Sequence, residues 1–277
     1  MLGRHGLQAK KSWGQNFLHD RSVHARIVAA AALTEDDVVV EIGAGLGTLT
    51  AALATAVPPP ARVIAIERDA DMLRVLAAEL GAEPRVTVMA ADAAALDFAA
   101  MSRDAGRPLV VVGNLPYQIA SALVVAIVHA GGALARAIVM VQREFAQRVV
   151  APPGNRTYGR LSVTVQQRAD ARILFHVPPG AFHPAPTVTS SVMRLALRPA
   201  PLAPVCDAAL FDEVVKQAFS TRRKMLRRAL EPAFGEPVVA RALAAAGIDE
   251  TLRAERLSVA DFARLADALE VERGRRA

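Results

Sequence analysis

The hydrophobic residues of this chain of 277 residues form short runs that alternate with helical patterns up to about residue 142. Runs rich in β-branched residues and bounded by Gly or Asp predict buried strands, whereas apolar positions three and four apart predict helices. The expected strands are 37–44, 62–68, 85–92, 108–114 and 136–142, and the expected helices are 22–33, 49–57, 70–80 and 118–130. This alternation indicates an α/β fold, with a doubly wound, mainly parallel sheet.

The pattern changes after residue 142. A helix is expected near 159–168. Two β-like runs follow, 171–177 and 190–197, joined by the segment PPGAFHPAP. We expect these two runs to form a hairpin at the edge of the sheet.

A proline-rich segment, RPAPLAP at 198–204, ends this part of the chain. Only helical patterns follow it, at about 207–231, 236–246 and 258–270. We therefore expect a domain boundary near residue 200. The first domain would cover 1–200, including an N-terminal arm at 1–21, and a small all-α domain would cover 201–277.

The composition is 53% hydrophobic, but no apolar run approaches the ~20 residues that span a bilayer. The N-terminus also lacks the apolar core of a signal peptide. We therefore expect a cytoplasmic protein with no membrane partner. Cys206 is the single cysteine, which excludes an internal disulfide, and the six histidines show no metal-ligand spacing. No metal site is expected.

The formal net charge of +6 favours a polyanionic partner, and the basic residues are concentrated. The segment 216–228 holds six basic residues and no acid, and the arm at 1–21 is a second basic segment. The residues expected to contact RNA phosphates are Arg222, Arg223, Lys224, Arg227 and Arg228. The alternative for this run is a solvated helix face.

Three glycines, Gly43, Gly45 and Gly47, lie where the first strand turns into a helix. Glycines there let the backbone approach a cofactor closely at the carboxyl edge of the sheet. Glu67 ends the next strand, where an acid can bind a ribose diol, and Asp92 ends the strand after it, near the cofactor base. The alternative is a tight turn with two acids that cap helices.

The glycine spacing is GxGxG rather than the GxGxxG of dinucleotide sites. Glu41 lies two residues before Gly43. A carboxylate at that position repels a pyrophosphate but suits a cofactor with a sulfonium and an amino-acid tail. We therefore expect S-adenosylmethionine (SAM) rather than NAD.

The fourth strand ends in Asn114-Leu115-Pro116-Tyr117. An exocyclic aryl amine is a poor nucleophile, because its lone pair is delocalised into the ring. The side-chain carbonyl of Asn114 and the backbone carbonyl of Leu115 could accept hydrogen bonds from the two N–H groups of such an amine and orient its nitrogen. Pro116 fixes the turn, and Tyr117 could stack on a flat base swung out of its helix. The alternative is an ordinary turn with Tyr117 in the core.

Seven further segments join this turn in one resemblance: KKSWGQNFLHD, EIGAGLGTLT, AIERDADM, YGRLSV, VPPGAFHPAPTVTSSVMRL, AFSTRRKMLRRAL and AERLSVADFARL. Together they resemble, in order over about residues 10–270, the ribosomal RNA adenine dimethylases. The resemblance implies a Rossmann-like methyltransferase sheet and dimethylation of two adjacent adenosines in a hairpin loop near the 3′ end of small-subunit rRNA. Such enzymes act on an immature 30S subunit, and we expect a monomer.

By the same resemblance, Asn16 and Leu18 contact SAM, together with Gly43, Gly45, Glu67, Asp92 and Asn114. Phe182 is expected to form an aromatic wall of the adenine pocket, opposite Tyr117. The alternative for Phe182 is an apolar plug in a proline-rich loop. The family commonly has Pro or Ala in the glycine loop where this chain has Ala44 and Gly47, which leaves the SAM assignment intact.

Three other functions fit parts of the pattern. A related methyltransferase of large-subunit rRNA shares the cofactor edge and the Asn114 turn, but the motifs after residue 200 favour the small-subunit substrate. A non-catalytic RNA-binding or transcription factor on the same scaffold has no need for both Asn114 and the glycine loop. An NAD-dependent oxidoreductase leaves the Asn114 turn unexplained.

Overall fold

A computed structural model describes residues 15–221 and 224–274 of the chain. They form two compact units. The sheet unit runs up to Ala146 and includes Asp170–Leu197, and the helical unit comprises Gln147–Ala169 and the residues from Arg198 onward. The boundary expected near residue 200 falls close to one of the three points where the chain passes between the units. Residues 147–169 were expected in the first domain and belong to the helical unit.

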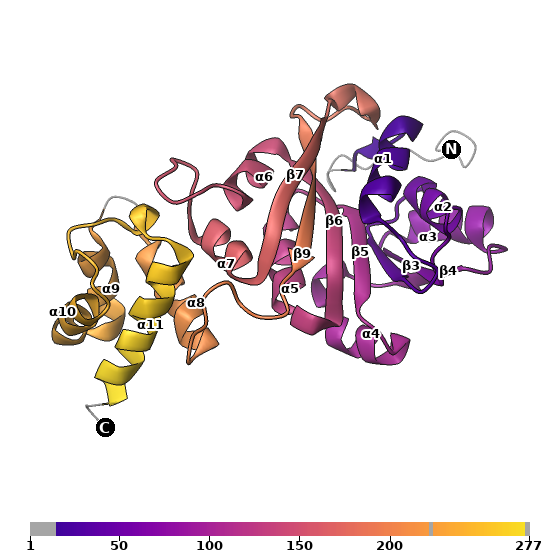
Figure 1. Cartoon of the computed structure of the whole chain (residues 1–277). Helices are drawn as coiled ribbons and strands as arrows, with labels where there is room; N and C mark the ends of the chain where they lie inside the picture. The colour runs from indigo at the N-terminus through magenta and orange to yellow at the C-terminus, as the bar shows by residue number, and fades with distance from the viewer. Residues whose placement is uncertain (1–14, 222–223, 275–277) are drawn as a thin grey trace. The chain divides into compact units, whose positions relative to one another are not determined.

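Among the described residues, one seven-stranded sheet is the centre of the sheet unit (Figure 1). Its strands are β2 (Val38–Ile42), β3 (Arg62–Glu67), β4 (Val86–Ala90), β5 (Leu109–Asn114), β6 (Leu134–Gln142), β7 (Ala169–Val177) and β9 (Ser190–Leu197). The strand order is β4-β3-β2-β5-β6-β9-β7. The first five strands in this order pair in parallel, and β9 pairs antiparallel with β6. This confirms the mainly parallel sheet with β7 and β9 added at one edge.

Helices lie on both sides of this sheet. They are α1 (Arg21–Ala31), α2 (Thr48–Ala54), α3 (Ala70–Leu80), α4 (Phe98–Ala105) and α5 (Ala120–His129), with α6 (Arg143–Val149) after β6. Apolar side chains of α1 and α2, such as Ile27 and Leu53, pack with strand residues such as Val63 in one core cluster. Leu76 of α3 packs against Ala65, which points to the same face as Val63 because strand residues alternate. These three helices therefore pack against the same face of the sheet.

The strand register brings four strand ends to one edge of the sheet. Ile42 of β2 pairs with Ile66 of β3 and with Gly113 of β5, and Glu67 of β3 pairs with Ala90 of β4. In a parallel sheet the segments that follow such paired residues leave on the same side. The glycine loop, Glu67, Asp92 and the Asn114 turn therefore converge.

A second, two-stranded sheet was not expected from the sequence. Strand β1 (Phe17–Leu18) pairs antiparallel with β8 (Phe182–His183), with Phe17 opposite His183 and Leu18 opposite Phe182. The His19 amide also donates to the Ala181 carbonyl at 3.0 Å. This pairing holds the segment at 15–18 beside the segment that precedes β9.

The helical unit contains α7 (Arg160–Arg168), α8 (Ala208–Ala218), α9 (Leu226–Phe234), α10 (Glu236–Ala245) and α11 (Val259–Gly274) around a core of its own. The single helix expected at 207–231 is wrong, because α8 ends at Ala218 and α9 begins at Leu226. The chain leaves α8 at Phe219, whose ring packs against Tyr158 and Phe262. Among the described helices of both units, none is long and apolar enough to cross a membrane.

Candidate active site

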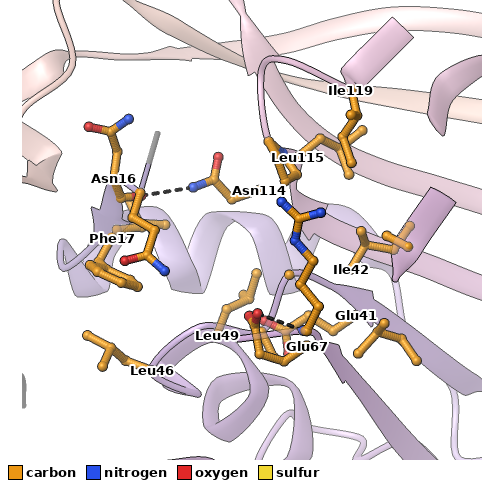
Figure 2. Close-up of a pocket in the computed structure, with 18 of the residues that line it drawn as sticks. Asn16, Phe17, Glu41, Ile42, Leu46, Leu49, Glu67, Asn114, Leu115 and Ile119 are labelled. Carbon is orange, nitrogen blue, oxygen red and sulfur yellow. Dashed lines mark hydrogen bonds between the residues drawn. The ribbon is translucent and has the colours of Figure 1, made fainter. Parts of the chain in front are cut away.

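A pocket opens at the carboxyl ends of β2, β3, β4 and β5 in the sheet unit (Figure 2). Its walls come from the glycine loop, from the residues that follow β3 and β4, and from the turn after β5. Residues 15–18 form the remaining side, together with His24 of α1 and with Thr48 and Leu49 of α2. The glycine loop, the acids after β3 and β4 and the Asn114 turn, which the sequence predicts to form one site, therefore line one pocket.

The glycine loop has the backbone conformation that its sequence requires. Gly43, Gly45 and Gly47 all have positive φ, at 73°, 55° and 75°. A Cβ on Gly45 would lie 3.2 Å from Cε1 of Phe17, and a Cβ on Gly47 would lie 2.8 Å from Cδ2 of Leu76. Glycine at 45 thus lets residues 15–18 approach the loop, whereas glycine at 47 lets α3 pack beneath it.

The carboxylate of Glu67 is held by three backbone amides. Oε2 accepts from the Gly45 N–H at 2.9 Å, and Oε1 accepts from the N–H groups of Arg68 and Asp69 at 2.8 Å each. A carboxylate has about four acceptor positions, so one remains for a ligand in the pocket. Glu67 is half-buried, which leaves that position open to a hydroxyl group.

Asp92 is exposed and performs two structural tasks. Its Oδ1 accepts from the Ala94 amide at 2.9 Å, which caps the short 3-10 helix at Ala93–Ala95, and its Oδ2 lies 3.4 Å from Nη1 of Arg68. The capping role is the alternative that the sequence left open. Asp92 also lines the pocket, so the two roles coexist.

Glu41 is the most deeply buried acid of the pocket, with 2% of its surface exposed. Burial raises the pKa of Glu41 to about 8; the nearby Thr50 hydroxyl opposes this shift in part, and the charge of Glu67 adds to it. Neither Oε2 of Glu41 nor Oγ1 of Thr50 meets the geometry of a hydrogen bond with any described residue. A buried carboxyl with an open oxygen suits a cationic ligand, which would hold it in its ionised form.

The Asn114 turn presents two acceptors to the pocket. The Asn114 side chain donates from Nδ2 to the Asn16 carbonyl at 3.2 Å, so its oxygen faces away from Asn16 (Figure 2). The Leu115 amide donates to the Met140 carbonyl at 3.0 Å, which fixes the turn on β6. Within 15–221 and 224–274, no residue donates a hydrogen bond to the Leu115 carbonyl. Pro116 next to it is exposed and has no N–H.

Tyr117 is half-buried, and its hydroxyl oxygen lies 2.7 Å from Oγ of Ser190. Burial raises the pKa of Tyr117, and the hydrogen bond with Ser190 opposes this shift in part. Ser190 is fully buried at the start of β9. No sequence pattern indicates this role for Ser190, because it lies 73 residues from Tyr117 in a segment that predicts only a strand.

Residues 15–18 are anchored at each position. Gln15 donates to Oδ2 of Asp69 at 2.9 Å, Asn16 accepts from Asn114, and Phe17 lies against Gly45. Leu18 belongs to β1. The structure thus brings Asn16 and Leu18 to the pocket together with Gly43, Glu67, Asp92 and Asn114.

Phe182 does not have the position that the sequence analysis expected. Only 3% of its surface is exposed, and it packs with Leu18, Val177 and Val192 in the core beneath the sheet. It is not among the residues that line the pocket. Its partner across β1 and β8 is Leu18, so the ring is used to hold residues 15–18 and corresponds to the apolar-plug alternative.

The basic run of the helical unit divides into different groups. Arg222 and Arg223 lie outside the described residues. Arg227 contacts three carboxylates, those of Glu231 at 2.8 Å, Glu236 at 2.6 Å and Glu250 at 2.8 Å. Its charge is therefore neutralised within the unit, and the expected RNA contact of Arg227 does not fit this position.

Lys224 and Arg228 are exposed and, together with Arg253, line a shallow groove on the helical unit. Glu231 is the one acid of this groove, and it lies 3.1 Å from Arg228. Of the residues named from the sequence for RNA contacts, Lys224 and Arg228 thus remain open to a phosphate.

This sheet, glycine loop and pair of acids at strand ends define the protein as a Rossmann-like methyltransferase, and the fold implies SAM as methyl donor. A family model described as ribosomal RNA adenine dimethylase matches residues 6–270. The chain belongs to the ribosomal RNA adenine dimethylase family.

Two relatives described as ribosomal RNA small subunit methyltransferase A have nearly the same length. The relative from Anaeromyxobacter dehalogenans (strain 2CP-C) is 46% identical over 279 residues, which cover 97% of this chain and 96% of the relative. The relative from Myxococcus xanthus is 43% identical over 274 residues, covering 97% and 94%. The similarity therefore includes both compact units.

Two solved structures share the fold. The 23S rRNA methyltransferase ErmE has a TM-score of 0.69 at 27% identity, covering 92% of this chain and 100% of that chain. A dimethyladenosine transferase from Plasmodium falciparum has a TM-score of 0.74 at 23% identity, covering 90% and 95%. Similarity of the fold alone does not separate one RNA substrate from another.

Proposed function

We propose that this protein transfers methyl groups from SAM to the N6 amines of two adjacent adenosines in the 3′-terminal hairpin loop of small-subunit rRNA. We place this activity on an immature 30S subunit in the cytoplasm, with the protein acting as a monomer. The relatives named for the small-subunit enzyme are 40–46% identical to this chain, whereas the structure named for 23S rRNA is 27% identical. This difference favours the small-subunit substrate.

The pocket fits SAM on two observations. Gly43 of the glycine loop lines the pocket without a side chain, and the buried Oε2 of Glu41 has no partner among the described residues. The residues that would hold the cofactor are Glu67 at the ribose, Asp92 at the adenine amine, Glu41 at the cationic amino-acid end, and the backbone of Gly43, Asn16 and Leu18 around it. Gly45, expected at the cofactor, does not line the pocket, and its N–H donates to Glu67 instead. When bound, SAM supplies an electrophilic methyl group on a sulfonium.

The observation that carries the proposal is the pair of acceptors at the Asn114 turn. Oδ1 of Asn114 faces away from Asn16, and the Leu115 carbonyl receives no hydrogen bond within the described part of the chain. Two acceptors can receive hydrogen bonds from both N–H groups of an exocyclic amine and hold the nitrogen in line with a methyl group. No residue need act as a strong base, because the proton leaves after the nitrogen has become cationic.

Tyr117 supplies the flat surface on which a base swung out of its hairpin would stack. Its hydrogen bond to Ser190 holds the ring against the sheet unit. Phe182 has no face open to the pocket, so Tyr117 alone takes this role in the proposal.

RNA affinity in this proposal comes from phosphate contacts that do not depend on sequence. Lys224 and Arg228 are exposed and line the basic groove, and Arg222 and Arg223 directly precede them in the chain. Arg227 is excluded from this group by its three carboxylate partners.

The test is methylation of ribosomal subunits that lack the modification. Purified protein, SAM with a labelled methyl group and immature small subunits are incubated together, and methyladenines are mapped on the rRNA by mass spectrometry. We expect dimethyladenosine at two adjacent positions in the 3′-terminal hairpin, and no product with the Asn114→Ala variant. Label on large-subunit RNA alone would assign the chain to the large-subunit alternative.

A further inference from the structure

A histidine of α1 lines the pocket and has no role in the site described so far. His24 follows the N-cap residue Asp20 by one helical turn, and 5% of its surface is exposed. The other buried residues of α1 are Val23, Ile27 and Ala31. A titratable ring thus occupies a position on a helix face that is otherwise apolar.

Among the described residues, the ring of His24 has one weakly bonded neighbour. Its Nε2 lies 3.4 Å from Oγ1 of Thr48, which in turn lies 3.5 Å from the Leu18 carbonyl. Both separations are at the long end for hydrogen bonds between side chains. His24, Thr48 and Leu18 all line the pocket, so the imidazole and the hydroxyl can both turn toward a ligand.

Burial lowers the pKa of His24, with Asp20 opposing and His19 adding to this shift. A buried polar ring with such long contacts costs free energy unless it gains a better partner. An anionic group in the pocket would supply that partner, because it would accept from the imidazole and the Thr48 hydroxyl together.

The charges around the pocket are unevenly placed. Three acids line it, Glu41, Glu67 and Asp92. Of the described lining residues, only His24 and Arg68 can carry a positive charge. Arg68 lies 3.4 Å from Asp92, beyond the end of β3, which is the adenosine side of the proposed site. On the other side, where α1 and α2 meet the glycine loop, His24 is the one lining residue of the described chain whose ring can donate to an anion, as a neutral imidazole or as a cation.

We propose that His24 and Thr48 bind the carboxylate of the amino-acid tail of SAM and of its product S-adenosylhomocysteine. The pocket would then recognise an α-amino acid at both of its charges, with Glu41 at the ammonium group and the His24–Thr48 pair at the carboxylate. This inference rests on the proposed use of SAM and adds specificity residues to it.

The test compares two ligands that differ only in the carboxylate. S-adenosylhomocysteine and its decarboxylated analogue are titrated by calorimetry into the full chain and into the variants His24→Leu, Thr48→Val and His24→Gln. For S-adenosylhomocysteine we expect binding about tenfold or more weaker with His24→Leu, about threefold to tenfold weaker with Thr48→Val, and partly restored with His24→Gln, whose amide can still donate. Binding of the decarboxylated analogue should stay unchanged in all three.

Glu67→Gln is the matched control, because it acts on the ribose and should weaken both ligands by the same factor. Equal losses of the two ligands in His24→Leu and Thr48→Val would mean that these residues only shape the pocket, and would overturn the inference. Unchanged binding of both ligands in these variants would overturn it as well. A wild-type chain that binds neither SAM nor S-adenosylhomocysteine would instead reject the proposed function itself. Thermal melting of each variant identifies losses that come from unfolding.

Discussion

The hydroxyl of Tyr117 is hydrogen-bonded to Ser190, with 2.7 Å between the two oxygens. Ser190 is the first residue of β9 and pairs with Gln142 at the end of β6. The turn that would bind the target amine is thereby connected to the antiparallel edge of the sheet. The position of the Tyr117 ring depends on a residue that does not itself line the pocket.

Ser190→Ala is expected to lower kcat by about threefold to tenfold, because one hydrogen bond of this kind contributes about 0.5–1.5 kcal/mol. Binding of S-adenosylhomocysteine should not change. Tyr117→Phe should lose a similar factor, and the double variant should be no slower than either single variant, since both remove the same bond. Single-turnover methylation and calorimetry measure the two quantities.

Ser191→Ala is the matched control for this prediction. Ser191 is equally buried, and its Oγ lies 2.8 Å from Nδ1 of His176, away from the pocket-lining residues. This variant should leave kcat unchanged. A kcat loss in Ser191→Ala as large as in Ser190→Ala would show that the strand as a whole matters, not the bond to Tyr117.

Glu67→Gln should weaken SAM binding by about 1–3 kcal/mol, which is roughly fivefold to 150-fold. The amide nitrogen of Gln cannot accept hydrogen bonds from the N–H groups of Arg68 and Asp69 or from that of Gly45. Calorimetry with SAM measures the loss. Asp92→Asn should cost less, since Asp92 is exposed and its capping bond can be made by Asn. Unchanged affinity in Glu67→Gln would exclude this residue from the ribose.

The pKa of Glu41, raised to about 8 by burial, predicts that SAM binding is linked to proton release. Below that pH the carboxyl holds its proton in the ligand-free protein, and a cation at Oε2 favours the ionised form. Affinity should therefore increase as the pH rises from about 6 to about 8, and then level off. Calorimetry at pH 7 in buffers of different ionisation enthalpy measures the released proton. Glu41→Gln should release none, and equal heats in all buffers for the wild type would contradict the prediction.

The carboxyl of Glu41 should also make the free energy of unfolding depend on pH, and this quantity should fall with rising pH whereas SAM affinity rises. In the unfolded chain the pKa of Glu41 returns toward 4.5, so between about pH 4.5 and 8 the native state holds a proton that the unfolded state has lost. The contribution of Glu41 to the free energy of unfolding therefore falls as the pH rises through this window. The melting temperature of Glu41→Gln should exceed that of the wild type by more at pH 8 than at pH 5, without ligand.

Arg227 and Arg228 are adjacent in sequence and should respond oppositely to replacement by Met. Arg227→Met leaves three carboxylates without their shared partner, so it should lower the melting temperature. Arg228→Met should leave melting nearly unchanged, because the Arg228 side chain is exposed and Glu231 keeps its ion pair with Arg227. It should instead weaken RNA binding and reduce the slope of log affinity against log salt by about one. An unchanged salt slope would show that Arg228 belongs to a solvated helix face and does not contact RNA phosphates.

The parts of the site that could be predicted from the sequence lie at the ends of strands. Glu67, Asp92 and Asn114 each stand at the end of an apolar, β-branched run, and a parallel sheet brings the ends of such strands to one edge. The run before Asp92 forms the half-exposed strand β4, not a buried one. The assignment of Asn16 and Leu18 to the site rests on the family resemblance alone, because no local sequence pattern indicates that β1 pairs with β8.

The parts that were missed depend on packing between distant segments. Ser190 gains its role only through Tyr117, and His24 only through the approach of α1 to Thr48. Phe182 was assigned to the pocket, although the pairing with Leu18 turns it into the core. The helical pattern at 207–231 gave no sign of the break after Ala218, since Phe219 packs against residues far along the chain.

The pairing of β1 with β8 also orders events during synthesis of the chain. Phe182 and His183 leave the ribosome roughly ten to thirty seconds after Phe17 and Leu18, at 5–20 residues per second. Until then the parallel strands β2 to β5 can form, but the segment that closes the pocket has no strand to join. A nascent chain should therefore acquire its cofactor affinity in one step, once Phe182 and His183 have emerged.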